Sequence, residues 1–135
     1  MNLKYFLLPF VAWIISGSLK FLINAIRQKS FSRAKNLIGY GGLPSTHTTI
    51  ISSAVFFYGF SEGFFNPIFT LGLTIMLLFM MDAFTLRRKV GEHAKILNQL
   101  QKKIILRERM GHSGIEIFCG IFLGIILGYI FANFL

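Results

Sequence analysis

Residues 117–135 read IFCGIFLGIILGYIFANFL, a run without a single charged side chain. A helix needs about 20 mostly apolar residues to cross the hydrocarbon core of a bilayer, so this run is predicted to span a membrane. Gly120, Gly124 and Gly128 are four residues apart within it and fall on one helix face. Such a stripe of small residues permits close packing against another helix.

Three further runs of similar character precede it. We predict four transmembrane helices at about residues 5–26, 45–61, 64–86 and 113–134, with Asn66-Pro67 as a helix start before the third. A cleaved signal peptide is the alternative for the first run. We reject it because no small-residue cleavage site precedes a polar mature domain, and Lys20 and Arg27 follow instead. The chain is therefore expected to be a single all-α integral membrane domain over residues 1–135.

The composition excludes several classes of protein. The chain is 54% hydrophobic, with a mean hydropathy of +0.65, and yet it carries a formal net charge of +9. A nucleic-acid-binding module would place its basic residues on a mostly polar surface, so no nucleic-acid partner is expected. The single cysteine, Cys119, excludes an internal disulfide and any CxxC metal or redox site.

A basic, polar segment separates the third and fourth runs. In it Ile96, Leu97, Leu100 and Ile104 recur at helical spacing. This pattern predicts an amphipathic interfacial helix at about residues 91–108, lying on the membrane surface and holding anionic membrane lipids.

The charges also predict the orientation. Apart from Lys4 and Glu62, the charged side chains belong to the two longer loops or to the span ends beside them. By the positive-inside rule both loops face the cytoplasm and both termini lie outside. We therefore expect a multi-pass protein of the inner (plasma) membrane whose polar groups gather at the cytoplasmic face.

Several of these groups have the spacing of a phosphate site. Lys20 and Arg27 are two helical turns apart, so they project from one face. Residues 41–47 form a glycine turn that runs into a helix start, where free N–H groups favour an anion. We expect Pro44 in the first turn of that helix and the Ser45 hydroxyl as a further donor. An ordinary N-cap would explain Ser45 but not His47.

A histidine and a carboxylate lie near the start of the last span. His112 and Glu116 are four residues apart, so the carboxylate could accept the Nδ1 proton and leave Nε2 free as a nucleophile or base. Asp82 ends the third span and needs either a function or a partner, since a charge inside a span is costly. A simple ion pair with Arg87 or Arg88 is the alternative for Asp82.

These residues together resemble the divergent branch of the type-2 phosphatidic acid phosphatase superfamily, which is related to acid phosphatases and vanadium-dependent haloperoxidases. Residues 41–48 (GGLPSTHT) are similar to its GGMPSSHS segment and residues 82–88 (DAFTLRR) to its DAxGVRR. Residues 94–98 (AKILN) resemble its AxxLN and residues 111–116 (GHSGIE) its GHTPxEV. The combination in this order is specific, whereas any one motif alone is not.

The parent superfamily uses KxxxxxxRP, PSGH and SRxxxxxHxxxD motifs in a metal-free phosphatase with a phosphohistidine intermediate. Lys20 and Arg27 fit the first spacing, with Gln28 in place of proline, and residues 44–47 fit the second, with Thr46 in place of glycine. The third is degraded: Arg107 lies five residues before His112, where the parent has six. Arg87 lies six before His93, but Ile96 then replaces the acid, so His112 is preferred.

The resemblance implies a role for each matching residue. The catalytic groups would be the nucleophile His112, the acid and base His47, and the carboxylates Glu116 and Asp82. No metal or other cofactor is implied. The phosphate would be held by a larger set, in which the arginine that completes the site stays open among the last three: Lys20, Arg27, Ser45, Thr46, Arg87, Arg88 and Arg107.

The expected substrate is a phosphomonoester lipid of the inner leaflet, such as phosphatidylglycerol phosphate or phosphatidic acid. An isoprenoid phosphate or diphosphate is the alternative substrate, and a small anion channel or carrier is the non-enzymatic alternative. Vanadate-dependent oxidation fits a lipid-embedded site poorly. The parent fold has about six helices, so the four predicted here form either a reduced bundle or a homodimer that joins through the Gly120, Gly124 and Gly128 face.

Overall fold

The computed structural model describes residues 3–29, 42–100 and 105–134. Within these ranges the chain forms helices and no strands, which confirms the all-α prediction. The helices are α1 (Leu3–Gln28), α3 (Thr46–Glu62), α4 (Pro67–Phe84), α5 (Leu86–Leu100) and α6 (Gly114–Asn133). Asn66 caps α4 by accepting a hydrogen bond from the Ile68 N–H, with Pro67 in the first turn as the sequence predicts.

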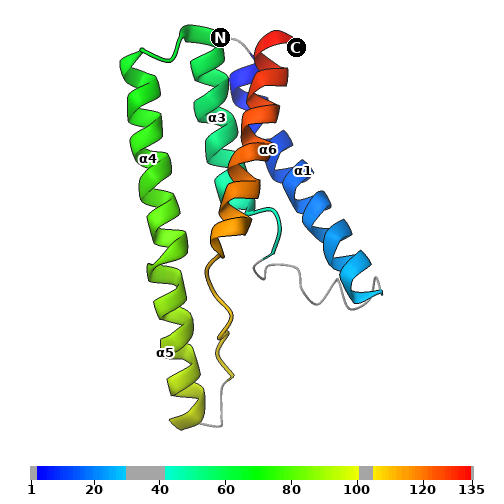
Figure 1. Ribbon diagram of the computed structural model, residues 1–135, viewed down its shortest axis with the longest axis vertical. Coiled ribbons are helices and arrows are strands. Elements are labelled where there is room, and N and C mark those ends of the chain that lie inside the picture. The colour runs from blue at the N-terminus through cyan, green and yellow to red at the C-terminus, as the bar shows by residue number, and fades with distance from the viewer. Residues whose placement is uncertain (1–2, 30–41, 101–104, 135) are drawn as a thin grey trace.

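Four helices form the bundle. α1 begins and α6 ends at the same end of it, while α1 crosses the others at an angle (Figure 1). α3 contacts α1, α4 and α6 and is thus the central helix. Because α3 is covered by three other helices, it tolerates the many hydroxyl side chains of the second predicted span.

The glycine face of α6 packs on α3. A Cβ added at Gly120 would lie 2.7 Å from the Ser45 carbonyl oxygen, and one at Gly128 would lie 2.7 Å from the Phe57 nitrogen. At Gly124 it would overlap the Ser52 hydroxyl. The small residues therefore let two helices of one chain approach closely. The prediction that this face joins two copies of the chain is wrong, because α3 already covers it.

Apolar clusters hold the remaining helices. Leu8 and Ala12 of α1 pack with Phe57 of α3 and with Leu127 and Phe131 of α6. A second cluster joins α3 to α4: Val55, Phe69 and Met76. Most large apolar side chains of α1, α4 and α6 are nevertheless exposed, as expected for helices that face lipid.

Three helical stretches are long and apolar enough to cross a membrane: Leu3–Gln28, Pro67–Leu100 and Gly114–Asn133. α3 has 17 residues and is slightly shorter than the usual crossing length. Its residues correspond to the predicted second span, so the bundle contains the four predicted helices. Three of the four are long and apolar enough to cross a membrane.

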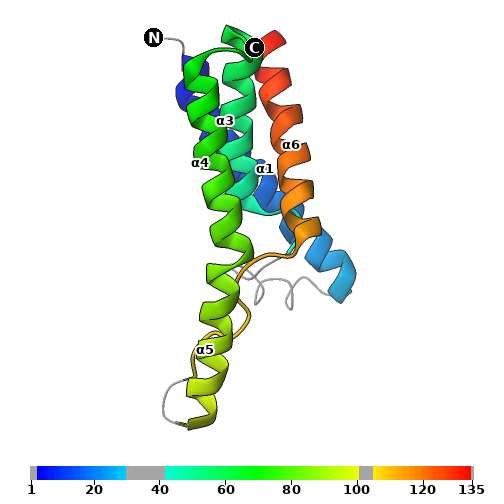
Figure 2. The same cartoon turned by 60° about the vertical axis from the view of Figure 1, so that its left-hand side comes forward.

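α5 continues α4 along nearly the same axis, beyond the end of the bundle (Figure 2). Only Thr85 separates the two helices, and the Lys89 N–H donates to the Thr85 carbonyl oxygen, so helical hydrogen bonding resumes at once. The amphipathic helix was expected to lie on the membrane surface. This arrangement contradicts that expectation, because α5 points away from the bundle instead.

The amphipathic helix also ends earlier than predicted. α5 stops at Leu100, and residues 105–110 return beside it without helical structure. The N–H and the carbonyl oxygen of Leu106 both bond to the side-chain amide of Asn98, which replaces helical partners there. The boundary of 91–108 was therefore wrong at both ends, since α5 begins at Leu86.

The start of α3 differs in one detail from the sequence prediction. Ser45 is the N-cap and the helix begins at Thr46, so Pro44 precedes the cap and is not in the first turn. The Leu43–Pro44 peptide bond is cis. The glycine turn is described only from Gly42 onward, and the rest of its predicted sequence lies outside the described residues.

Candidate active site

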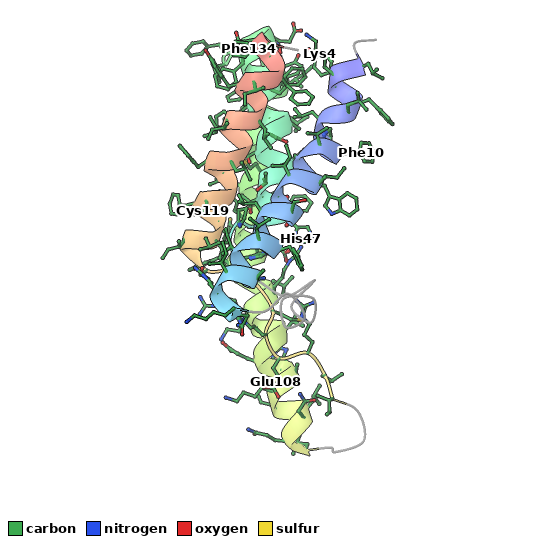
Figure 3. The ribbon with its side chains drawn as sticks, turned by 90° about the vertical axis from the view of Figure 1, so that its right-hand side faces the viewer. Lys4, Phe10, His47, Glu108, Cys119 and Phe134 are labelled. Atoms are coloured by element: carbon green, nitrogen blue, oxygen red, sulfur yellow. The ribbon has the colours of Figure 1, made fainter. Side chains whose placement is uncertain are left out.

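The predicted site residues gather where the bundle gives way to α5. Figure 3 shows His47 at this level, with Glu108 further out beside α5 and with Lys4 and Phe134 at the opposite end. The end of α4, the start of α3 and the start of α6 meet here, joined by backbone hydrogen bonds. His112 is central to this junction.

Two hydrogen bonds and the backbone conformation of the preceding glycine fix His112. Its backbone N–H donates to the Ala83 carbonyl oxygen at 3.2 Å, which ties it to the last turn of α4. Its Nδ1 lies 2.9 Å from Glu116 Oε2. Gly111, just before it, has φ +84°, a backbone conformation that glycine adopts without strain. His112 is 9% exposed, so the imidazole is held in a largely buried position.

The Glu116 carboxylate has two tasks. It accepts the Ser113 backbone N–H at 3.1 Å, while Ser113 Oγ accepts the Glu116 N–H, so the two residues form a capping box at the start of α6. The same oxygen is bonded to His112 Nδ1. Because a carboxylate only accepts, this bond favours the tautomer with the proton on Nδ1 and a lone pair on Nε2.

The environment of His112 favours the neutral imidazole. Burial lowers its pKa from the ordinary histidine value, the hydrogen bond and charge of Glu116 oppose that change, and the cations Lys20 and Arg87 add to it. The pKa is lowered on balance, which favours the neutral imidazole. With the proton on Nδ1 towards Glu116, the neutral ring has its lone pair on Nε2. A nitrogen in this state can act as a nucleophile.

Ser45 connects the start of α3 to α6, and its hydroxyl is bonded within the protein and is not exposed to a ligand. Its N–H donates to the Glu116 carbonyl oxygen at 2.9 Å. Its Oγ is 2.9 Å from Thr48 Oγ1, and the residue is fully buried. The side chain does not cap α3, so it leaves the first-turn N–H groups of that helix unused by the N-cap residue.

His47 lies in the first turn of α3 and is exposed. It interacts electrostatically with His112 and with three charged side chains: Lys20, Asp82 and Arg87. The two histidines, a lysine, a carboxylate and an arginine from four helices and the loop before α6 therefore form one cluster. The structure thus places near one another five of the residues that the sequence prediction grouped in one site.

The three candidate arginines have different surroundings. Arg87 Nε is 2.7 Å from Asp82 Oδ2, and it also interacts with both histidines. Arg88 lies over the Phe84 ring, 5.4 Å from its centroid. Arg107 interacts with Lys20. Arg87 thus lies on the side of the two histidines, and Asp82 is both its ion-pair partner and a neighbour of His47.

Arg88 borders an open hollow of about 330 Å³ between the end of α4 and the start of α6. His112 and Glu116 form part of its wall. The other lining residues are Phe84, Arg109, Met110, Gly111, Ser113 and Gly114. The hollow combines cationic and apolar walls beside the imidazole.

Lys20 of α1 lies close enough to the cluster for its charge to be attracted by Glu116 and repelled by Arg107. A Cβ added at Gly42 would lie 3.8 Å from the Lys20 side chain and 3.7 Å from that of Asn24, so the turn before α3 lies against α1. Arg27 is exposed in the last turn of α1, and the described contacts do not tie it to the histidines. Thr46 is half-buried at the start of α3.

The sequence of the chain is similar to those of a known protein family. The sequence profile of the divergent PAP2 family matches residues 1–127. The chain belongs to this family. The uncharacterized membrane protein YuiD of Bacillus subtilis is 27% identical over 70% of this chain and 72% of its own length. No solved structure matches the chain.

Membership of the divergent PAP2 family agrees with the motifs quoted from the sequence and suggests a phosphatase-related role. Together with the apolar helices, it makes the chain a multi-pass membrane protein. The described residues contain no group of three or more His, Cys, Asp or Glu side chains that could hold a metal ion.

Two amides near the site were missed by the sequence reasoning. Asn24 lies one turn beyond Lys20 and faces Gly42, and its polar side chain in an apolar run was the available signal. Asn98 was quoted only as part of a motif, but it bonds to two residues of the returning segment.

Proposed function

We propose that this protein is a metal-independent phosphatase that hydrolyses a phosphomonoester lipid through a phosphohistidine intermediate on His112. The observation that carries the proposal is the His112 Nδ1 to Glu116 bond of 2.9 Å beside His47, because it leaves Nε2 as a free lone pair within a cationic cluster. An ordinary structural histidine would not require Lys20 and Arg87 nearby as well.

In the first step His112 Nε2 attacks phosphorus in line with the ester bond. The new N–P bond forms as the P–O bond to the lipid alcohol breaks, and protonated His47 gives its proton to the leaving oxygen. Glu116 stabilises the imidazole as it becomes positively charged. This last role needs no proton transfer to the carboxylate.

In the second step His47 accepts a proton from a water molecule, whose oxygen attacks phosphorus. The N–P bond breaks, inorganic phosphate leaves, and His112 recovers its lone pair while His47 is again protonated. General acid and base catalysis of this kind contributes roughly 10²–10⁴ in rate.

Charge on the phosphoryl oxygens is balanced by the cations around the two histidines. Lys20 and Arg87 are the best supported, since both interact with His112 and His47. Asp82 orients Arg87 through their ion pair. The N–H groups at Thr46 and His47 supply further donors at the start of α3. Arg107 lies near Lys20, and Arg88 borders the hollow beside His112. The described contacts do not tie Arg27 to the histidines.

The substrate class follows from the surroundings of the site. The hollow beside His112 has Arg88 and Arg109 for an anionic headgroup and Phe84 and Met110 for apolar contact. Exposed side chains of α4 and α6 suit acyl chains. With the positive-inside orientation, the site faces the cytoplasm of the inner (plasma) membrane. Phosphatidylglycerol phosphate and phosphatidic acid fit best, and an isoprenoid phosphate is the second choice.

Phosphate release from both lipids in detergent micelles tests the proposal. We expect His112→Ala and His47→Ala each to lower release by at least about 10²-fold, following the size of acid and base contributions. His93→Ala is the matched control, because His93 is an exposed histidine on α5. Undiminished release by the first two variants would refute the assignment. Transport of phosphate into liposomes without any hydrolysis would favour an anion carrier instead.

A further inference from the structure

One face of α5 is used to hold the segment that returns to the site. Gly91, Ala94 and Asn98 share this face, and the first two are buried. A Cβ added at Gly91 would overlap the Glu108 carbonyl oxygen and lie 3.3 Å from the Met110 nitrogen. The returning backbone therefore passes directly over the helix.

Asn98 makes three hydrogen bonds to that segment. Its Oδ1 accepts the Leu106 N–H at 2.8 Å, and its Nδ2 donates to the Leu106 carbonyl oxygen at 2.8 Å. The same nitrogen donates to Glu108 Oε1 at 2.8 Å. One amide thus replaces the partners that two backbone groups would find in a helix or sheet, and it fixes the residues on both sides of Arg107.

Arg107 is the residue between these anchors. Its Nε donates to the Arg109 carbonyl oxygen at 3.3 Å, and its charge interacts with Lys20 on α1. The segment then continues through Gly111 to His112, whose N–H is bonded to α4. The amide on α5 is therefore connected to the site by a short stretch of chain with Arg107 at its start.

We infer that Asn98 is a positioning residue that holds Arg107 beside Lys20, so that the Arg107 guanidinium reaches the phosphate of the substrate. The inference rests on the proposed phosphatase function. Asn98 itself lies too far along α5 to touch the reacting atoms and acts only through the returning segment.

A double-mutant cycle on phosphate release tests this. We expect Asn98→Ala to lower kcat/KM by about tenfold or more, since small displacements of a charged group are costly. Arg107→Ala should cost at least as much, and the double variant should match Arg107→Ala within about twofold. The control is Gln99→Ala, an exposed amide on the same helix, with an expected change below twofold.

Exchanging the hydrogen-bond donor and acceptor between residues 98 and 108 gives a second test. In Asn98→Asp the new carboxylate can still accept the Leu106 N–H, but it repels Glu108 and cannot donate. Adding Glu108→Gln restores a donor between the two side chains, so kcat/KM should recover several-fold. Faster amide exchange at Leu106 in Asn98→Ala reports the lost bond without any substrate.

The outcomes separate the two proposals. Three results would overturn the role of Asn98 while leaving His112 as nucleophile. The losses of Asn98→Ala and Arg107→Ala could multiply in the double variant, Glu108→Gln could fail to restore kcat/KM in Asn98→Asp, or Gln99→Ala could lose as much activity as Asn98→Ala. A wild-type protein that releases no phosphate from any lipid phosphate would overturn the proposed function first.

Discussion

Two close backbone contacts organise this molecule, and they use different side chains. Where α6 meets α3, glycines face Ser and Thr. The Ser52 Oγ bonds chiefly to its own helix, at 2.6 Å from the Thr48 carbonyl oxygen, with a longer bond of 3.4 Å to the Gly120 carbonyl oxygen of α6. Where the returning segment meets α5, the small residues Gly91 and Ala94 let its backbone come close, and the Asn98 side-chain amide bonds to that backbone. Helices satisfy their own backbone groups, whereas a non-helical segment needs partners from outside.

The first contact holds the bundle together, and the second positions the chain that leads to the site. The α3–α6 contact holds the fold and also brings the Ser45 N–H to the Glu116 carbonyl oxygen. The α5 contact lies outside the bundle and holds only the chain that leads to His112. The two contacts meet at the pair His112 and Glu116, so changes to each should affect stability and activity in different proportions.

Gly124→Leu should have the largest effect because its side chain would overlap Ser52. We expect loss of monodisperse protein in detergent, or a destabilisation at the upper end of the roughly 1–3 kcal/mol typical of overpacking. Thermal unfolding with size-exclusion chromatography measures it. Gly17→Ala in α1, with open space around it, is the control and should be neutral or stabilising by up to about 1 kcal/mol. An unchanged Tm for Gly124→Leu would show that this contact does not hold the bundle.

Gly91→Ala should lower activity and leave stability nearly unchanged, in contrast to Gly124→Leu. The added methyl group pushes the returning segment away from α5 while the bundle stays intact, so phosphate release should fall by about tenfold with a nearly unchanged Tm. Steady-state kinetics and thermal unfolding on one preparation measure both, with Gln99→Ala alongside. A large fall in Tm would mean that the α5 contact supports the fold as much as the α3–α6 contact does.

Glu116→Gln should leave both contacts in place, since the bond from Ser45 is to the backbone, and change only the chemistry. The carboxylate raises the pKa of His112 against the lowering by burial. Its loss therefore lowers that pKa further and moves the acid limb of the kcat/KM profile to lower pH. We expect a fall of about tenfold on the plateau. An acid limb that moves to higher pH would contradict the pairing of Glu116 with His112.

The sequence predicted the helices of the bundle well because apolar runs bounded by Gly, Pro and charge have few alternatives in a membrane. It also predicted the pairing of His112 with Glu116. The single helix assumed for that spacing was wrong, because α6 begins at Gly114 and His112 precedes its N-cap Ser113. The sequence failed where tertiary contacts decide. The partner of the glycine face depends on Ser52, which is distant in sequence. The end of α5 depends on the hydrogen bonds of Asn98 to Leu106, which helical periodicity does not reveal.

Ser45 and the arginines show the same limit within the site. The motif predicts a hydroxyl for the phosphate, but burial against Thr48 is visible only in three dimensions. Spacing left the choice of arginine open, and the ion pair with Asp82 distinguishes Arg87 from its neighbour Arg88. The sequence thus predicts which residue types gather, and packing determines which side chains face the substrate.

Trapping the intermediate tests the central claim most directly. In His47→Ala, para-nitrophenyl phosphate needs no proton donor for its leaving group, so His112 should still take the phosphoryl group, which water then cannot remove efficiently. The account predicts a burst of about one equivalent of nitrophenolate per protein and a phosphoryl group on His112 by mass spectrometry. Turnover without a phosphorylated protein, or a phosphoryl group on another residue, would contradict it.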